Sequence, residues 1–323
     1  ITLFAEHYAS LAERVPLVLG QSYPEFRVML VYVCHDTGFY EDLVQLRHSF
    51  PQIATTKIHL DPRFPISRKM ALNVGIKSAH YEHMVFTSTD AVPQTDRWLS
   101  LMAKGFMRGE IVLGYCGVER TKGLANYLMR SGRMMHAAEW IARAVRGRAY
   151  RGTLHNFGFT KKLYFGANGF SHLNMNIGED DLFLQRVITP DNVSVILSPR
   201  ATLREKTWGG LRWWMSQLRY YGSSLRFYPA AVRSYIRQET GSRVLFFLTV
   251  LCALAVMPLE YKLAALLLAL IRYAVVLLEV RRTAQRLGET GILGRYFLYD
   301  LLSPLWAALL GLQLLRRDER VWR

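Results

Sequence analysis

Three groups of polar side chains stand where they could bind a ligand or move a proton. Asp90 ends "HMVFTSTD", where an apolar run reaches a loop; Glu179 and Asp180 lie in "GEDDL"; Gln217 and Arg219 lie in "WWMSQLRYY". Carboxylates can hold a divalent cation or accept a proton, and a guanidinium can bind a phosphate group. Asp90 in particular is either a turn residue or a ligand for something positive.

Each group also has a purely structural interpretation. An Asp at the end of a strand is commonly a turn residue. The acids before "LFLQRV" would ordinarily be the first turn of a helix, where the helix dipole favours negative charge. The segment "RWWMSQLRYY" could form an interfacial helix. The surrounding elements and the order of the groups along the chain have to decide between these interpretations.

The first two-thirds of the chain alternate between short apolar runs and helical patterns. The runs predict strands at Phe26–Val33, Met84–Thr87, Glu110–Tyr115 and Val193–Leu197, and helices at Leu11–Gly20, Lys69–Ala79 and Leu124–Arg146. This alternation predicts an α/β fold whose mostly parallel sheet is flanked by helices. Asp36 and Asp90 would lie beyond the carboxyl ends of strands, where such sheets bind ligands.

The last part of the chain is apolar. Three runs, Val244–Leu259, Leu263–Leu278 and Phe297–Leu315, are candidate membrane segments, although each is short against the about 20 residues that a span needs. Arg272 and Asp300 lie inside two of them. Because an unpaired ion in a membrane is costly, we expect these two to meet. The alternative is that Arg272 only extends its charged end to the interface.

Charge supports a membrane partner. The formal charge is +16, from 41 Lys and Arg against 25 Asp and Glu, and basic residues flank the apolar runs. Anionic headgroups on the cytoplasmic side attract such residues, whereas no recognisable nucleic-acid module is present. Three spans would place the basic tail outside, so we expect the third segment to be re-entrant or interfacial. The three cysteines are too scattered for a disulfide framework or a zinc site.

We therefore expect three parts: an α/β domain at 1–206, an amphipathic interface segment rich in Trp, Tyr and Arg at 207–240, and membrane helices with a basic tail at 241–323. The sequence begins with Ile and has no signal-peptide pattern, which indicates a fragment of a longer chain.

Taken in order, "RFPISRKMALNVGIKSAHYEHMVFTSTDAVPQTDRWL", "FGANGF", "GEDDL" and "WWMSQLRYY" resemble the inverting nucleotide-sugar glycosyltransferases of the second sequence family, which have the GT-A fold. The arrangement is most similar to the bacterial membrane-associated branch, with a catalytic domain ahead of a few apolar helices. The motifs cover about two-thirds of the chain, and the rest matches in architecture only.

The resemblance implies a donor site. Asp90 is similar to the second acid of the family's DxD motif, which holds a divalent metal, Mg or Mn, on the donor diphosphate. Ser88 stands where the family has the first acid, and a serine brings no charge. The family's upstream acidic pair for base and ribose is also missing, so that only Asp36 remains nearby. Lys69 resembles a lysine close to the nucleotide diphosphate, or else lies in a solvated first helical turn.

The resemblance also implies roles for the later motifs. Asp180 is similar to the general base that takes the proton of the acceptor hydroxyl, and Glu179 to a neighbour that binds the acceptor. Gln217 and Arg219 resemble the polar residues that bind the diphosphate. Asn168 is similar to an amide of the substrate loop, or else it is an Asn in a left-handed turn between glycines.

These implications lead to an expected function. The chain is expected to be a metal-dependent membrane glycosyltransferase of the bacterial inner membrane, with its catalytic domain in the cytoplasm. Its expected partners are a nucleotide-sugar donor, a lipid-linked or envelope saccharide acceptor, and membrane lipids. Two alternatives stay open: a processive polysaccharide synthase, which would normally have more spans, and a non-catalytic membrane scaffold, favoured by Ser88 and the missing acidic pair.

Overall fold

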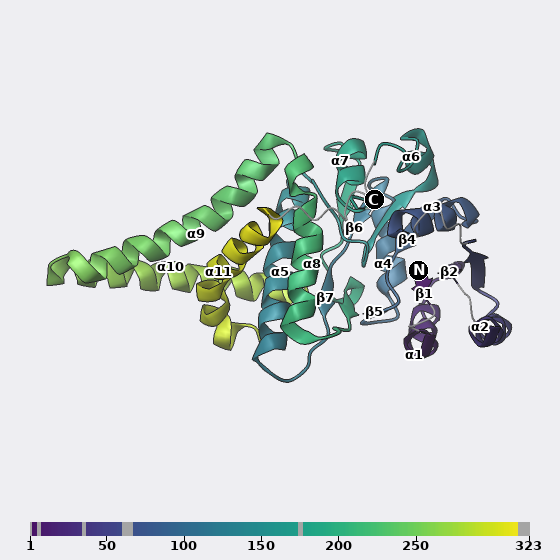
Figure 1. Ribbon diagram of the computed structural model, residues 1–323, viewed down its shortest axis with the longest axis horizontal. Coiled ribbons are helices and arrows are strands. Elements are labelled where there is room, and N and C mark those ends of the chain that lie inside the picture. Colours follow the sequence, from purple (N-terminus) through teal and green to yellow (C-terminus); the bar gives the residue numbers. More distant parts are fainter. Residues whose placement is uncertain (1, 5–7, 34–36, 60–66, 174–176, 316–323) are drawn as a thin grey trace. The chain divides into compact units, whose positions relative to one another are not determined.

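The computed structural model describes residues 2–4, 8–33, 37–59, 67–173 and 177–315 (Figure 1). These residues form two compact units. The first is built from the described residues within 1–119 and 136–208, and the second from those within 120–135 and 209–315. Helix α5 (Leu124–Val145) runs through both units.

The first unit begins with a parallel sheet. Strands β1 (Thr2–Phe4), β2 (Val28–Val33) and β3 (Ile53–Lys57) lie in that order. The helices around them are α1 (Tyr8–Leu19), α2 (Thr37–Ser49) and α3 (Arg68–Ser78). Because helices connect successive strands, the strands run parallel. The predicted strand at Phe26 is therefore β2, and its Leu30 is fully buried.

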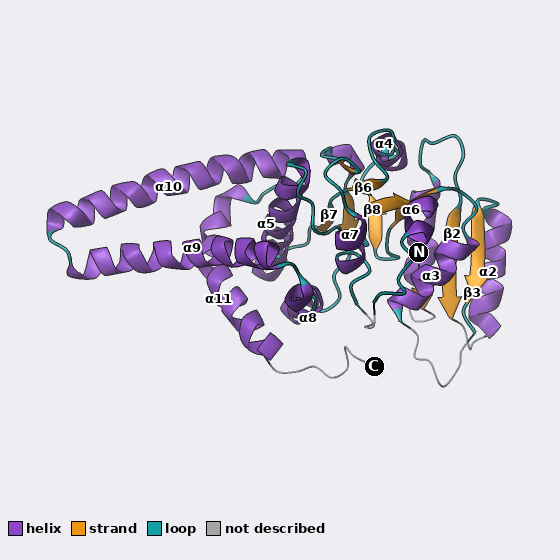
Figure 2. Cartoon of the chain, turned by 90° about the horizontal axis from the view of Figure 1, so that it is seen from above, coloured by secondary structure: helices purple, strands orange, loops and turns teal. Residues whose placement is uncertain are grey.

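Two further sheets complete the first unit. One has the order β4-β8-β6-β9 and the other β5-β10-β7. Their strands are β4 (His83–Phe86), β5 (Ala91–Pro93), β6 (Ile111–Leu113), β7 (Cys116–Val118), β8 (Phe157–Thr160), β9 (Val193–Val195) and β10 (Leu203–Glu205). Helices α4 (Trp98–Gly105), α6 (Lys161–Gly166) and α7 (Leu182–Val187) join them, together with the turn η2 (Pro199–Ala201) (Figure 2).

The expected mostly parallel sheet is only partly present. Among the described strands, four of the seven pairings are parallel and three are antiparallel. The difference comes mainly from β8, which lies antiparallel to both β4 and β6. This strand has room beside β4 because Gly158 has no side chain, and a Cβ there would lie 2.4 Å from the carbonyl oxygen of Met84.

Buried aromatic rings and one buried amide hold the middle of the first unit. Phe157, Phe159, Tyr164 and Phe183 pack as neighbours with ring centroids 5.3 to 5.8 Å apart. Asn156 accepts a hydrogen bond from the Trp98 indole at 2.9 Å, and its amide donates to two backbone oxygens. These contacts fix the segment that leads to the acids before α7.

The second unit is helical. Besides the first half of α5 it contains α8 (Gly210–Ser223), α9 (Ala230–Val256), α10 (Leu259–Arg286) and α11 (Tyr296–Leu315), with the short turns η3 (Leu225–Phe227) and η4 (Leu293–Arg295). Helices α9 and α10 lie side by side as a long hairpin (Figure 1).

Within the described residues, α9 and α10 are the two helices long and apolar enough to cross a membrane. They have 27 and 28 residues, so the helices extend beyond the apolar runs that looked short in the sequence. Little of either apolar stretch is buried inside the protein. Helix α11 covers the third apolar run.

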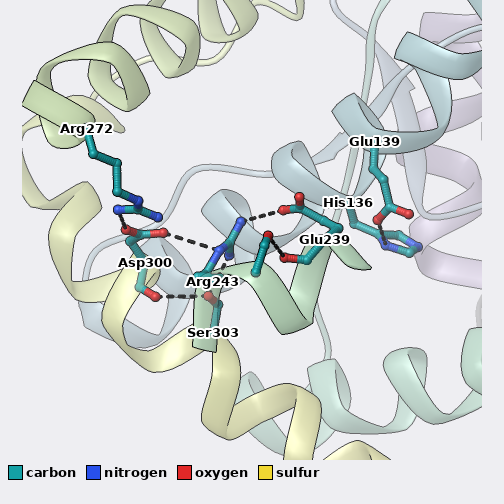
Figure 3. A network of polar contacts seen from close by, with 8 residues as sticks. His136, Glu139, Glu239, Arg243, Arg272, Asp300 and Ser303 are labelled. Carbon is teal, nitrogen blue, oxygen red and sulfur yellow. Dashed lines mark hydrogen bonds and ion pairs between the residues drawn. The ribbon is translucent and has the colours of Figure 1, made fainter. Parts of the chain in front are cut away.

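The expected pairing of Arg272 with Asp300 is confirmed. Arg272 Nη1 donates to Asp300 Oδ2 at 2.8 Å, and Arg243 Nε lies 3.4 Å from Asp300 Oδ1 (Figure 3). Arg243 also donates to Glu239 at 2.7 Å. The Arg272 guanidinium additionally lies 4.4 Å from the ring centre of Phe246. Arg243 and Arg272 thus compensate the charge of Asp300, which is almost fully buried among apolar helices, and this pairing makes its burial tolerable.

Candidate active site

Three consecutive acids form the centre of the candidate site. Glu179, Asp180 and Asp181 lie directly before α7 and are almost completely buried, with 0%, 3% and 2% of their surfaces exposed. Asp181 is the N-cap of α7, because its Oδ1 accepts a hydrogen bond from the N–H of Leu182. The first turn of α7 contains no acid. Glu179 and Asp180 therefore need another explanation for their burial.

Asp180 is held close to its point of half-protonation at neutral pH. Burial, followed by the negative charge of Asp181, raises its pKa from 3.8 to about 7. The charges of Arg151 and Arg68 act in the opposite direction. Its own backbone oxygen accepts a hydrogen bond from Gly152 N at 2.9 Å, which fixes the segment in place. A carboxyl with this pKa can accept and release a proton near pH 7.

Lys69 lies beside these acids. It is in the first turn of α3, which begins after the N-cap Ser67, and its Nζ donates to the carbonyl oxygen of Leu173 at 2.5 Å. Burial lowers the pKa of Lys69, and the charge of Glu179 opposes this shift. Lys69 thus lies in the first helical turn, as the structural alternative expects, but its side chain is partly buried and hydrogen-bonded.

The loop after β4 presents buried oxygens that lack a partner within the protein. The backbone oxygen of Asp90 accepts from Lys206 N at 3.0 Å and from Arg14 Nη1 at 2.6 Å. Asp90 Oδ1 and the hydroxyls of Ser88 and Thr87 are buried and have no hydrogen-bond partner. Since unpaired buried polar atoms are costly, a hydrogen-bond donor or a cation bound there would stabilise these oxygens.

Two buried residues that the sequence did not single out link this loop to the acids. Glu205, on β10, pairs in register with Ala91, the residue after Asp90. His155 Nε2 lies 3.1 Å from Glu205 Oε1, and its Nδ1 lies 3.1 Å from Thr153 Oγ1. Thr153 follows Gly152, which bonds to Asp180. Asp90 and Asp180 thus belong to one connected region of the first unit.

The remaining candidates lie elsewhere or outside the described residues. Asn168 is exposed and adopts φ 58°, so the left-handed turn that its neighbouring glycines suggested is present. Gln217 and Arg219 lie on α8 in the second unit. Two positions apart on a helix, they face different sides of it. Asp36 lies outside the described residues.

The side chains that could act as metal ligands limit how a metal ion could be bound. Within the described ranges, no group of three or more His, Cys, Asp or Glu side chains could bind a metal on its own. A Mg or Mn ion that also binds a diphosphate needs only one or two carboxylates from the protein. The unpaired oxygens of Asp90 and Ser88 fit that arrangement. They do not fit a site that binds metal without a substrate.

The fold is similar to that of solved proteins that bind nucleotide sugars. One is the mannosyltransferase PcManGT from Pyrobaculum calidifontis, in complex with GDP-Man and Mn²⁺, with a TM-score of 0.54, 16% identity, and coverage of 95% of this chain and 86% of that chain. Another is S. aureus TarS 1-349 in complex with UDP-GlcNAc, with a TM-score of 0.45, 15% identity, and coverage of 82% of this chain and 78% of that chain. No protein-family model and no curated protein matches the chain. At these identities, the similarity to PcManGT shows a shared fold, and the weaker one carries no argument.

Proposed function

We propose that this protein is a membrane-associated glycosyltransferase that transfers a sugar from a nucleotide-diphosphate donor to a lipid-linked or envelope saccharide, with inversion at the anomeric carbon. The observation that carries the proposal is the buried carboxyl of Asp180, whose pKa is raised to about 7 in a fold shared with a mannosyltransferase. Buried acids with a pKa near neutrality are typical of general bases.

Three acids of the first unit have separate roles in the proposed reaction. Asp180 accepts the proton of the acceptor hydroxyl while that oxygen bonds to the anomeric carbon and the bond to the donor diphosphate breaks. A single displacement of this kind inverts the configuration and needs no covalent enzyme intermediate. Glu179, buried beside Asp180, orients the acceptor. Asp181 keeps the acids in position by capping α7.

The loop after β4 is the proposed donor site. Asp90, with Ser88 beside it, would hold Mg or Mn, which when bound neutralises charge on the leaving diphosphate. Lys69 adds a positive charge near Glu179. Asn168 is proposed to contact the sugar or acceptor, Asp36 the nucleoside, and Gln217 with Arg219 the diphosphate, the last by charge-assisted hydrogen bonds.

The helices of the second unit support the membrane part of the proposal. The exposed leucines of α9 and α10 would form an apolar surface too large for a protein in water. Two spans would return the chain to the side where it entered, which leaves both flanking basic regions on the cytoplasmic face. A lipid-linked acceptor would then be delivered from the same bilayer.

The direct test is transfer activity of Asp180→Asn. This change keeps the shape of the side chain but removes the proton acceptor, so transfer should fall by at least about a hundredfold, the usual contribution of a general base. Nucleotide binding should stay within about twofold of the parent, because Asp180 is assigned to the acceptor and not to the donor. The matched control is Asp191→Asn, an exposed aspartate of the same unit. Unchanged turnover in Asp180→Asn would remove Asp180 from the role of base.

A non-catalytic scaffold is the second candidate, because Ser88 supplies no charge where a second acid would strengthen metal binding. The same preparation distinguishes the two candidates. Absence of binding to any nucleotide diphosphate, with Mn²⁺ present, would favour the scaffold.

A further inference from the structure

The second unit contains a cavity of about 400 Å³ that the proposed reaction does not use. It lies where α9, α10 and α11 meet, and Met135 of α5 completes its wall. Part of the wall is apolar and comes from Val275, Val276 and Val280 of α10. The charged side chains that line it are Glu239, Arg243, Arg272, Glu279 and Asp300. Figure 3 shows that most of these charged groups point toward one another.

The cavity lies at a defined depth along the hairpin of α9 and α10. Arg243 lies 14 residues before Met257, where the hairpin turns, and Arg272 lies 14 residues after Pro258. At 1.5 Å per residue, both arginines are about 21 Å from the turn, and Glu279 is about 32 Å from it. A hydrocarbon core of about 30 Å that begins at the turn would therefore end close to Glu279. The cavity thus extends across the boundary between hydrocarbon and headgroups.

The charges around the cavity favour a ligand without net charge. Three acids and two arginines are among the described residues that line it. Arg243 already donates to Glu239 and to Ser303, and its Nε lies 3.4 Å from Asp300 Oδ1. A ligand with several negative charges, such as a lipid diphosphate, would be repelled by the three acids. A headgroup that carries one charge of each sign matches this wall.

Arg272 and Glu279 present opposite charges at two depths. They are seven residues apart on α10, so they lie on the same face of the helix. Arg272 is the deeper of the two. A guanidinium has five N–H donors, and the hydrogen bond of Arg272 Nη1 to Asp300 Oδ2 uses one of them. A phospholipid whose acyl chains point toward the hairpin turn presents its phosphate first and the end of its headgroup second, which is the same order as the two side chains.

We propose that this cavity binds the headgroup of a phospholipid with a primary ammonium, phosphatidylethanolamine, with its phosphate on Arg272 and its ammonium on Glu279 and Glu239. The bound lipid would hold α9, α10 and α11 together at the place where Asp300 already joins them. The inference rests on the membrane part of the proposed function and is independent of the transfer reaction.

The test is thermal unfolding of the full chain in nanodiscs of phosphatidylcholine alone, with added phosphatidylethanolamine, or with added phosphatidylglycerol. Phosphatidylcholine has the phosphate but no N–H donor, and phosphatidylglycerol has a net negative charge. Phosphatidylethanolamine should raise the unfolding midpoint of the parent by about 2 to 4 °C, because a ligand that binds only the folded state stabilises it. Phosphatidylglycerol should leave the midpoint at its value in phosphatidylcholine.

Two variants alter the cavity while keeping the ion pairs of Asp300. Glu279→Gln removes a charge that faces the ammonium, and its exposed pair with Arg282 contributes little to stability. Val276→Phe fills the cavity without changing a charge. Both should lose the shift caused by phosphatidylethanolamine. Leu268→Phe, at an exposed position of α10 outside the cavity, is the matched control and should retain it.

Three results would overturn the proposal. A shift that persists in Val276→Phe and Glu279→Gln would be an effect of the bilayer and not of the cavity. An equal shift with phosphatidylglycerol would exclude recognition of the ammonium. Insertion into nanodiscs without a shift specific to phosphatidylethanolamine would contradict the headgroup site alone, whereas failure to insert would contradict the membrane part of the proposed function and the site with it.

Discussion

At the scale of single residues, the burial of Asp180 predicts an unusual dependence of stability on pH. Its folded-state pKa of about 7 lies above the ordinary 3.8, so the folded protein binds the proton more tightly than the unfolded chain. The contribution to stability is complete below about pH 4 and is lost as the pH rises to about 7. Asp180→Asn should therefore be more stable than the parent at about pH 8, by on the order of a few kcal/mol.

Thermal unfolding of both forms between about pH 4 and pH 8 measures this difference, which should grow from about pH 4 to about pH 7 and stay constant above that. Asp180→Asn should therefore be more stable but less active than the parent. This is expected where a buried charge that the reaction needs lowers the stability of the folded protein. A midpoint difference that stays constant with pH would contradict the assigned titration. Asp191→Asn is again the control.

His155 and Glu205 allow a second prediction at this scale. Because they lie 3.1 Å apart and both are buried, His155→Ala leaves the Glu205 carboxylate without this partner. The change should lower the free energy of unfolding by about 3 kcal/mol. Chemical denaturation measures the loss, and His48→Ala, at an exposed position, should change stability by less than about 0.5 kcal/mol. A small loss at His155 would argue against a structural link between Asp90 and Asp180.

The sequence indicated the acids but not their partners. "GEDDL" and "TSTD" stand out locally because charged residues end apolar runs. His155, Glu205 and Arg151 lie in stretches without such a pattern, and only tertiary pairing brings them to the site. Ordinary spacing rules contain no signal for that pairing, since the partners are about 50 positions apart in the case of His155 and Glu205.

At the scale of elements, substitutions at Asn168 can distinguish a structural role in the turn from a functional role in substrate binding. The φ of Asn168 is 58°, a conformation that costs a residue with a Cβ about 1 to 2 kcal/mol. Asn tolerates it better than most residues, and Gly is not penalised. Asn168→Val should therefore destabilise the protein, whereas Asn168→Gly should not. If Asn168 also contacts the substrate, Asn168→Gly should raise the KM for donor or acceptor at unchanged stability. Unchanged kinetics in Asn168→Gly would restrict Asn168 to the turn.

The elements with strong apolar patterns were predicted well. The strands β2, β6 and β9 and the helices α3 and α5 lie within a few residues of their expected bounds. Strand β8 was missed because "FGFT" is short and contains glycine, and its antiparallel position explains why the sheet is less parallel than expected. Helix α2 (Thr37–Ser49) was missed as well. Such elements depend on tertiary contacts more than on local pattern.

At the scale of the whole molecule, the charge cluster of α9, α10 and α11 predicts how the apolar helices hold together. Asp300 is almost fully buried and contacts both Arg243 and Arg272. Asp300→Leu leaves two arginines without this acid and should cost about 3 kcal/mol. The double change Asp300→Leu with Arg272→Met should recover part of that loss, since it also removes one of the stranded charges.

Thermal unfolding in lipid nanodiscs of the parent, the two single variants and the double variant gives the coupling between the two sites. Arg282→Met, at an exposed position of α10 with a partner only three residues away, is the control. If the effects of Asp300→Leu and Arg272→Met on the unfolding midpoint are additive, the two residues do not stabilise the helices as a pair.

The central claim, a donor site at the loop after β4, is tested most directly by nucleotide binding. The measurement is the thermal unfolding midpoint of the detergent-solubilised chain with UDP, GDP, CDP or dTDP, each with and without Mn²⁺, for the parent and Asp90→Ala. The account predicts that one nucleotide stabilises the parent only when Mn²⁺ is present, and that Asp90→Ala loses this shift. No shift with any nucleotide, or a shift that survives in Asp90→Ala, would contradict it.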